Sequence, residues 1–297
     1  MWDAVTSRKF RDKPFKTVGQ VIVPEDPMVV LRADPPRSGD EQAKAMHRLK
    51  EPLRNKGTQE DQDQIIDLLA RTATADGSPV LRYAAIETLG RFEDPRVFAI
   101  LMLAYQKADG EPDAKLQPPK PLDSKIELAA GGRSAGRLPT HITEDPSSLR
   151  SPSGYAEDTV AALRCRCLES LGNIRTPEAA RFLAAVVGAA GADVAPPGSN
   201  DGEVRQAAVR ALAQSRQPEA VVALAYVLNT EAAKVGADKD PTLIHTAHQG
   251  LVRLTGKKLP PDPQQWNEVV QAGVTIAPQP NWVEDKVQSA VYWMKKK

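Results

Sequence analysis

The chain has 297 residues, 41% hydrophobic and 26% charged, with a mean hydropathy of -0.40. These values are ordinary for a water-soluble folded protein and allow one or two globular units or one elongated repeat array. Thirty-nine Lys and Arg against 38 Asp and Glu give a net charge of +1, which removes the electrostatic argument for nucleic-acid binding. The chain shows neither a signal-peptide core nor an apolar run of ~18–20 residues. If Met1 is the true start, we expect a cytoplasmic protein.

A repeat with a period near 41 residues is the most informative feature of the sequence, since Arg164 and Arg205 are 41 positions apart. Three segments, 81–95, 163–177 and 204–218, align without gaps and share an apolar-Arg pair, a Leu followed by Gly or Ala, and a closing Pro. Apolar residues in each copy recur at helical spacing, so each repeat is predicted to contain a pair of short helices. The signature residues are Arg82, Leu89, Pro95, Arg164, Leu171, Pro177, Arg205, Leu212 and Pro218.

In chain order, residues 1–39 have no helical period and predict an extended N-terminal arm. Helices are then predicted at 41–54, 59–75, 79–92, 95–108, 158–174, 177–188, 202–215, 218–233, 241–255, 263–272 and 282–296. A capping oxygen followed by a proline at the first helical position marks the starts at Ser78-Pro79, Asp94-Pro95, Thr176-Pro177, Asp240-Pro241 and Asp262-Pro263. Thr58 with Asp61 resembles a capping box.

The connection 109–157 interrupts the repeats and contains seven prolines and five glycines. This composition predicts a flexible or irregular insert. Connections on this edge of a repeat array often mark its binding side. The insert is either a plain surface linker or a partner-binding segment that becomes ordered on contact.

The segment from Leu81-Arg82 through Leu89-Gly90 to Asp94-Pro95, with its two equivalents, resembles the HEAT-repeat family, in particular the bacterial type related to phycobilin-lyase HEAT-like repeats. The resemblance implies an all-α fold, a right-handed α-solenoid of about five helix pairs. The expected organisation is an extended arm at 1–39, repeats at 40–108, the insert at 109–157, repeats at 158–272 and a C-terminal capping helix within 273–297.

Because HEAT-like repeats serve mostly protein contacts, the first functional hypothesis is a monomeric, non-catalytic scaffold or adaptor that binds an unknown protein partner. One alternative is a lyase-like or accessory enzyme of the same family. A second is a peripheral membrane adaptor that uses the C-terminal helix, which carries Trp282 and ends in three lysines at 295–297. We favour a capping role for that helix over membrane contact.

Candidate partner-binding residues belong to the repeat helices and to the insert: Tyr83, Glu87, Arg133, Arg137, Arg166, Glu169, Gln206 and Arg210. Glu87, Glu169 and Arg210 occupy one equivalent position, so the expected binding face is mixed in charge and unlike a basic DNA-binding stripe. The arginines of the signature are expected to be structural, with a packed stem and a head paired to a carboxylate, rather than an anion-binding ladder.

The sequence predicts no catalytic residue, metal or cofactor. Cys165 and Cys167 are two residues apart, which places them about 200° apart on a helix, so they cannot ligate one metal together. His245 and His248 could share a helix face but lack further ligands nearby. No histidine is followed by Glu, the pair on which HEAT-repeat hydroxylases of the deoxyhypusine type depend.

Overall fold

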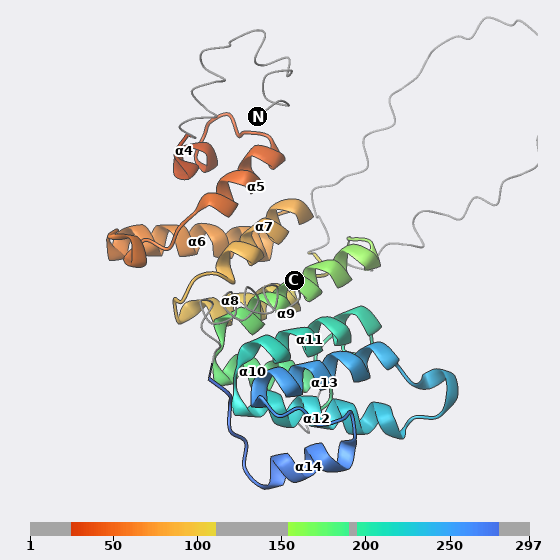
Figure 1. The fold of residues 1–297 in the computed structure, drawn as a ribbon. Coiled ribbons are helices and arrows are strands. Elements are labelled where there is room, and N and C mark those ends of the chain that lie inside the picture. Colours follow the sequence, from red (N-terminus) through yellow and green to blue (C-terminus); the bar gives the residue numbers. More distant parts are fainter. Residues whose placement is uncertain (1–24, 111–153, 190–194, 279–297) are drawn as a thin grey trace, which may run out of the picture. The chain divides into compact units, whose positions relative to one another are not determined.

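The computed structural model describes residues 25–110, 154–189 and 195–278, and the regular elements in these ranges are helices (Figure 1). The chain divides into two compact units, Met1–Ser170 and Leu171–Lys297. The first unit contains α4 (Pro27–Leu31), α5 (Gly39–Arg48), η1 (Leu53–Asn55), α6 (Gln59–Ala75), α7 (Pro79–Leu89), α8 (Arg96–Gln106) and most of α9 (Glu157–Ile174). The second contains the end of α9, α10 (Pro177–Val186), α11 (Gly202–Ser215), α12 (Pro218–Ala233), η3 (Gly236–Asp238), α13 (Pro241–Thr255) and α14 (Pro263–Gln271).

The predicted all-helical fold class is confirmed, and the predicted bounds of α6, α11, α12 and α13 match the structure at both ends. These helices begin at a strong N-terminal signal, such as the capping box of Thr58 and Asp61 at α6 or the Asp240-Pro241 pair at α13. Among the described helices, none is long and apolar enough to cross a membrane.

Two of the predicted cap signals work differently from the expectation. The Ser78 side chain makes no capping hydrogen bond, although Pro79 is the first residue of α7. The helix predicted to start at Pro95 starts at Arg96, and the Asp94 carboxylate accepts a hydrogen bond from the Arg96 backbone N–H at 2.9 Å. Asp94 therefore caps the helix although it lies two positions before the first helical residue, whereas the prediction placed it directly before that residue.

The expectation of an extended arm over 1–39 is wrong at residues 27–31, which form α4, while residues 1–24 lie outside the described residues. The Asp26 carboxylate caps α4 and Pro27 occupies its first turn, which together form a helix start signal. Because α4 has only five residues, it is too short to show a helical period in the sequence. Likewise, the helix predicted at 41–54 ends at Arg48. Pro52 disfavours the α-helical backbone conformation of Glu51, the residue before it, so the helix cannot continue to residue 54.

In the first unit, successive helices pack in two layers, with α5 against α7 in one and α6 against α8 in the other. The hydroxyl of Thr88 on α7 donates to the Met46 carbonyl of α5 at 3.1 Å. The hydroxyl of Ser170 on α9 donates to the Ile86 carbonyl of α7 at 3.1 Å in the same register, since these positions are equivalent in the repeat alignment. Close approach is possible because Gly90 of α7 has no side chain where it meets Ser170.

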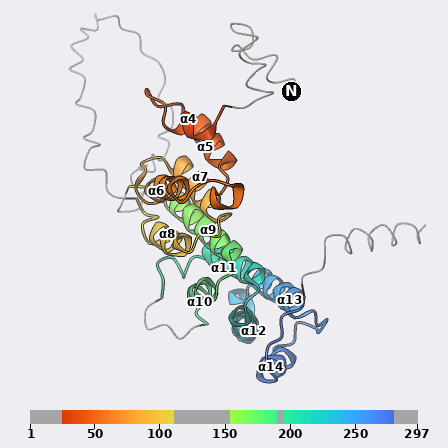
Figure 2. The same cartoon turned by 90° about the vertical axis from the view of Figure 1, so that its left-hand side faces the viewer.

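The second unit repeats this arrangement, with α11 against α13 in one layer and α12 against α10 and α14 in the other (Figure 2). Small residues again meet between neighbouring helices, because a Cβ at Gly172 would lie 2.7 Å from the Ala211 carbonyl oxygen and one at Gly250 would lie 2.9 Å from the Ala213 Cβ. Alanine, valine and leucine side chains fill the space between the layers, and Trp266 of α14 is fully buried.

A buried polar cluster joins η1, α6 and the start of α8 in the first unit. The Gln62 side-chain amide, which has no exposed area, donates to Glu51 at 3.3 Å and to Asp94 at 3.1 Å. Arg96 binds the Asp94 carboxylate through two nitrogens at 2.9 and 2.7 Å and pairs with Asp63 at 2.8 Å. These contacts, the Arg96 hydrogen bonds first, lower the pKa of Asp94 to about 2.

We predict that Gly90→Ala destabilises the protein by about 1–3 kcal/mol, the usual cost of overpacking. The added Cβ would lie 2.6 Å from the Ser170 Cβ and 2.9 Å from its Cα, so α7 and α9 would have to separate. The backbone of Gly90 is ordinary helix (φ -62°, ψ -7°), so torsional strain does not contribute. Urea denaturation measures the change, with Gly202→Ala as control, because nothing lies within 4 Å of a Cβ there. Equal midpoints for both variants would contradict the close packing.

We predict that Asp94→Asn lowers the free energy of unfolding at pH 7 by about 1–2 kcal/mol. A carboxyl group whose pKa is lowered by folding stabilises the folded state when it is ionised, and solvent screening reduces this contribution. Because folding lowers the pKa of Asp94 from 3.8 to about 2, its stabilisation is present above pH 3.8 and is lost as the pH falls towards 2. The difference between wild type and variant should therefore shrink over that interval. Denaturation at several pH values tests this, with the exposed Asp67→Asn as a control that should change nothing.

Candidate functional site

The candidate site lies on one surface of the first unit, built by α5, α7 and the first part of α9. We call it the α5–α7–α9 face and define it by Ala43, His47, Val80, Tyr83, Ala84, Glu87, Arg166 and Glu169. Tyr83 and Glu87 are four residues apart on α7, and Arg166 and Glu169 three apart on α9, so each pair shares a helix side. Four of the eight predicted partner-binding residues are thus brought together.

Arg166 is the centre of a polar network on this face. Its guanidinium donates a hydrogen bond to the Tyr83 hydroxyl and lies 4.3 Å from the centre of the Tyr83 ring, a cation–π contact. It also pairs with Glu169 at 3.2 Å and with Glu87 at 3.9 Å. Since one cation faces two carboxylates and a ring, its side chain is held in place rather than free in solvent.

The network extends to His47 on α5, whose Nδ1 lies 3.8 Å from the Glu87 carboxylate. His47 is not among the residues predicted from the sequence. The signal that could have found it is its place in the repeat. Residues 45–49 lie 40 positions before residues 85–89 and resemble them weakly, which aligns His47 with Glu87 and so with Glu169. The same repeat position thus carries a polar or charged side chain on each of α5, α7 and α9.

An apolar groove of about 270 Å³ lies beside the network. It is lined by Ala43, His47, Pro79, Val80, Tyr83, Ala84, Thr159, Ala162 and Leu163. Val80 is 56% exposed, so the apolar character of the groove reaches the surface. Tyr83 and His47 belong both to the groove and to the network, which makes the two features one surface.

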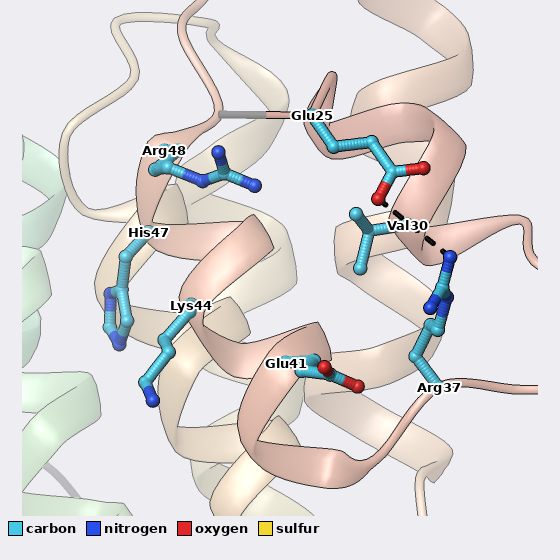
Figure 3. A pocket seen from close by; sticks show the side chains of 7 residues that line it. All are labelled: Glu25, Val30, Arg37, Glu41, Lys44, His47 and Arg48. Carbon is cyan, nitrogen blue, oxygen red and sulfur yellow. Dashed lines mark ion pairs between the residues drawn. The ribbon is translucent and has the colours of Figure 1, made fainter. Parts of the chain in front are cut away.

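A second pocket, of about 520 Å³, lies between α4 and α5 (Figure 3). Seven residues line it: Glu25, Val30, Arg37, Glu41, Lys44, His47 and Arg48. Arg37 pairs with Glu25 at 3.7 Å across one side of the opening. His47 borders this pocket as well as the groove, so the pocket extends the α5–α7–α9 face towards the N-terminal side of the unit.

The arginines of the repeat signature connect the start of one helix to the end of a helix in the other layer. Arg82 is 1% exposed and donates to the carbonyls of Ala73 at 3.0 Å and Lys107 at 2.6 Å, at the C-terminal ends of α6 and α8. The expected carboxylate partner is therefore wrong for Arg82, because helix ends supply carbonyl acceptors and a negative dipole there.

The other two signature arginines have the predicted carboxylate partners. Arg164 pairs with Asp109 at 2.6 Å, and Arg205 pairs with the buried Glu231 at 2.8 Å. Burial acts to raise the pKa of Glu231, but hydrogen bonds from Lys234, Arg205 and the Asp240 N–H outweigh it and lower the pKa. All three arginines are thus engaged by the protein itself.

The remaining predicted partner-binding residues do not join this face. Arg133 and Arg137 lie outside the described residues, as do most of the insert and the predicted helix at 282–296. Gln206 and Arg210 belong to α11 of the second unit, where Gln206 hydrogen-bonds the Asp240 carboxylate and Arg210 is exposed.

The two ends of the insert are close together in the first unit. A Cβ at Gly110 would lie 3.0 Å from the Tyr155 ring, and the Tyr155 hydroxyl donates to the carbonyls of Asp76 and Gly77, each at 3.1 Å. The chain therefore leaves and returns at the same point, beside the Arg82 guanidinium, whose central carbon lies 5.7 Å from the centre of the Tyr155 ring.

The cysteines and histidines have structural surroundings. Burial raises the pKa of the Cys167 thiol to about 12, while Cys165 is half-buried. His248 hydrogen-bonds the Leu259 carbonyl at 2.7 Å and contacts the Trp266 ring edge. Among the described residues, no group of three or more His, Cys, Asp and Glu side chains has an arrangement that could hold a metal ion.

These observations define an all-helical repeat protein made of stacked helix pairs. A family model for the PBS lyase HEAT-like repeat matches residues 81–107 and 204–230, which cover most of α7–α8 and of α11–α12. The chain therefore contains HEAT-like repeats at these two positions. No curated protein and no solved structure matches the chain.

We predict that Arg82→Met lowers the free energy of unfolding by about 2–4 kcal/mol, because two charge-assisted hydrogen bonds are lost and two carbonyls are left without a donor. Thermal denaturation measures this, with Arg71→Met on α6 as control, since Arg71 is exposed. A variant as stable as wild type would contradict the structural role and favour Arg82 as a ligand-binding cation.

Proposed function

We propose that the protein is a non-catalytic adaptor that binds a protein partner through the α5–α7–α9 face. The observation that carries the proposal is the continuity of the apolar groove with the fixed polar network. Protein interfaces combine an apolar centre with a polar rim, and tyrosine and arginine are frequent among the residues that contribute most of the binding energy. Tyr83 and Arg166 are already held against each other, so binding would order few additional side chains.

The charges of the face support selective rather than general adhesion. Arg166 is shared between Glu87 and Glu169, and His47 lies beside Glu87, so groups of both signs and a neutral or cationic ring occur close together. A mixed face of this kind favours partners with a complementary pattern and disfavours nucleic acid, which needs a basic surface.

A lyase-like enzyme is the alternative that the family name raises. A carboxylic acid that donates protons near neutral pH needs a raised pKa. In the described part of the chain, the carboxyl groups with a displaced pKa (Asp61, Asp94, Glu231 and Asp240) are all displaced downwards, and each accepts hydrogen bonds that hold the structure together. This pattern supports the adaptor over the enzyme.

The proposal is tested with a photo-cross-linking amino acid at Val80, in the groove. The control position is Leu103 on α8, which is 43% exposed and does not line the groove. In the source cells, irradiation is expected to link the Val80 variant to a discrete second polypeptide, and the Leu103 variant to none or to a diffuse background.

Adding Glu87→Lys to the Val80 variant should reduce the yield of that product severalfold, because it reverses one charge of the network. Comparable products from Val80 and Leu103, or none from Val80, would contradict the proposed binding face.

A further inference from the structure

The pocket between α4 and α5 contains two cations, Lys44 and Arg48, for which the described part of the chain supplies no partner. Lys44 and Arg48 are four residues apart on α5, and both side chains are exposed. In the described ranges of the chain, neither has an ion pair or a side-chain hydrogen bond. The other charges around the pocket are engaged: Arg37 pairs with Glu25, and the Glu41 carboxylate accepts a hydrogen bond from the Ser38 hydroxyl at 3.0 Å.

The pocket is larger than a single small ion requires. Its volume of about 520 Å³ falls in the range of ~300–1,000 Å³ that is typical of ligand pockets. Figure 3 shows Lys44, His47 and Arg48 along one border, with Arg48 extending towards the interior and Val30 on the opposite border. The buried Val30 side chain adds an apolar contact to a border that is otherwise polar.

We infer that this pocket binds the carboxylate side chains of an acidic peptide segment of the protein partner. This inference rests on the proposed function, since it assumes a partner docked on the α5–α7–α9 face. Side chains four residues apart on a helix are about 5–6 Å apart at Cβ, and alternate side chains of an extended peptide recur every ~6.5–7 Å. Two acidic residues separated by one can therefore reach Lys44 and Arg48 together, with the Arg48 guanidinium able to bind a carboxylate through two nitrogens.

The position of His47 connects the pocket to the groove. Because His47 borders both, a peptide leaving the pocket along α5 passes directly onto the apolar groove lined by Ala43 and Val80. The recognised segment is therefore acidic where it meets Lys44 and Arg48 and apolar where it meets the groove.

The experiment measures binding of a fluorescent peptide to the full chain by anisotropy. The peptide is Leu-Glu-Ser-Glu-Ser-Leu with blocked ends, and the matched peptide has glutamine in place of each glutamate. We expect the glutamate peptide to bind more tightly than the glutamine peptide, and its affinity to fall as the salt concentration rises.

The double variant Lys44→Gln with Arg48→Gln should weaken binding of the glutamate peptide roughly tenfold, as expected for two partly exposed ion pairs. The matched control, Arg71→Gln with Lys258→Gln, removes one arginine and one lysine from exposed positions that do not line the pocket, and should leave the affinity unchanged. Circular dichroism of both variants checks that the fold is kept.

Equal affinity of wild type and of the Lys44 and Arg48 variant for the glutamate peptide would overturn the inference. Equal affinity of the two peptides for wild type would do the same. Displacement of the glutamate peptide by inorganic phosphate at the same concentration as the peptide would also overturn it, because the site would then bind small anions in general. If the Val80 variant cross-links to a partner but any of these results is found, the inference about the pocket is refuted and the proposed function is not. If the Val80 variant gives no cross-link, the proposed function itself is refuted.

Discussion

The close approach of neighbouring helices within each layer is the constraint on which the structure depends. Gly90 against Ser170 and Gly172 against Ala211 leave no room for a larger side chain. At that distance the hydroxyls of Thr88 and Ser170 reach the carbonyls of the preceding helix, at Met46 and Ile86. Small residues therefore stabilise the stack twice, since they allow dense packing and they bring buried polar groups within hydrogen-bond distance.

The signature arginines solve the second problem of such a stack, which is that short helices expose many unpaired carbonyls at their C-terminal ends. Arg82 satisfies two of these ends at once, and Arg205 reaches Glu231, which in turn accepts the Asp240 N–H before α13. Each of these arginines is therefore bound by a carbonyl or a carboxylate of the protein itself. The proposed binding chemistry uses positions 83, 87 and 166 instead, which lie within five residues of a signature arginine.

The α5–α7–α9 face shows how a repeat with no catalytic signature can still acquire a specific surface. Positions that are equivalent in the repeat need not carry the same side chain, since the position occupied by Glu87 on α7 and Glu169 on α9 is occupied by His47 on α5. Arg166 of α9 is equivalent in the repeat to Ala84 of α7, and Ala84 lines the groove. The scaffold sets the spacing, and single substitutions at equivalent positions set what the surface can recognise.

The sequence by itself determined the helical class, the repeat and most helix bounds, because these depend on local signals: apolar spacing, capping residues and prolines. It also selected Tyr83, Glu87, Arg166 and Glu169 as candidate partner-binding residues. Only the tertiary structure decided that Arg166 joins them to His47, that Arg82 binds carbonyls and not a carboxylate, and that α4 and α5 enclose a pocket. These features depend on which residues from distant parts of the chain meet when the helices pack, and spacing along one helix carries no information on that.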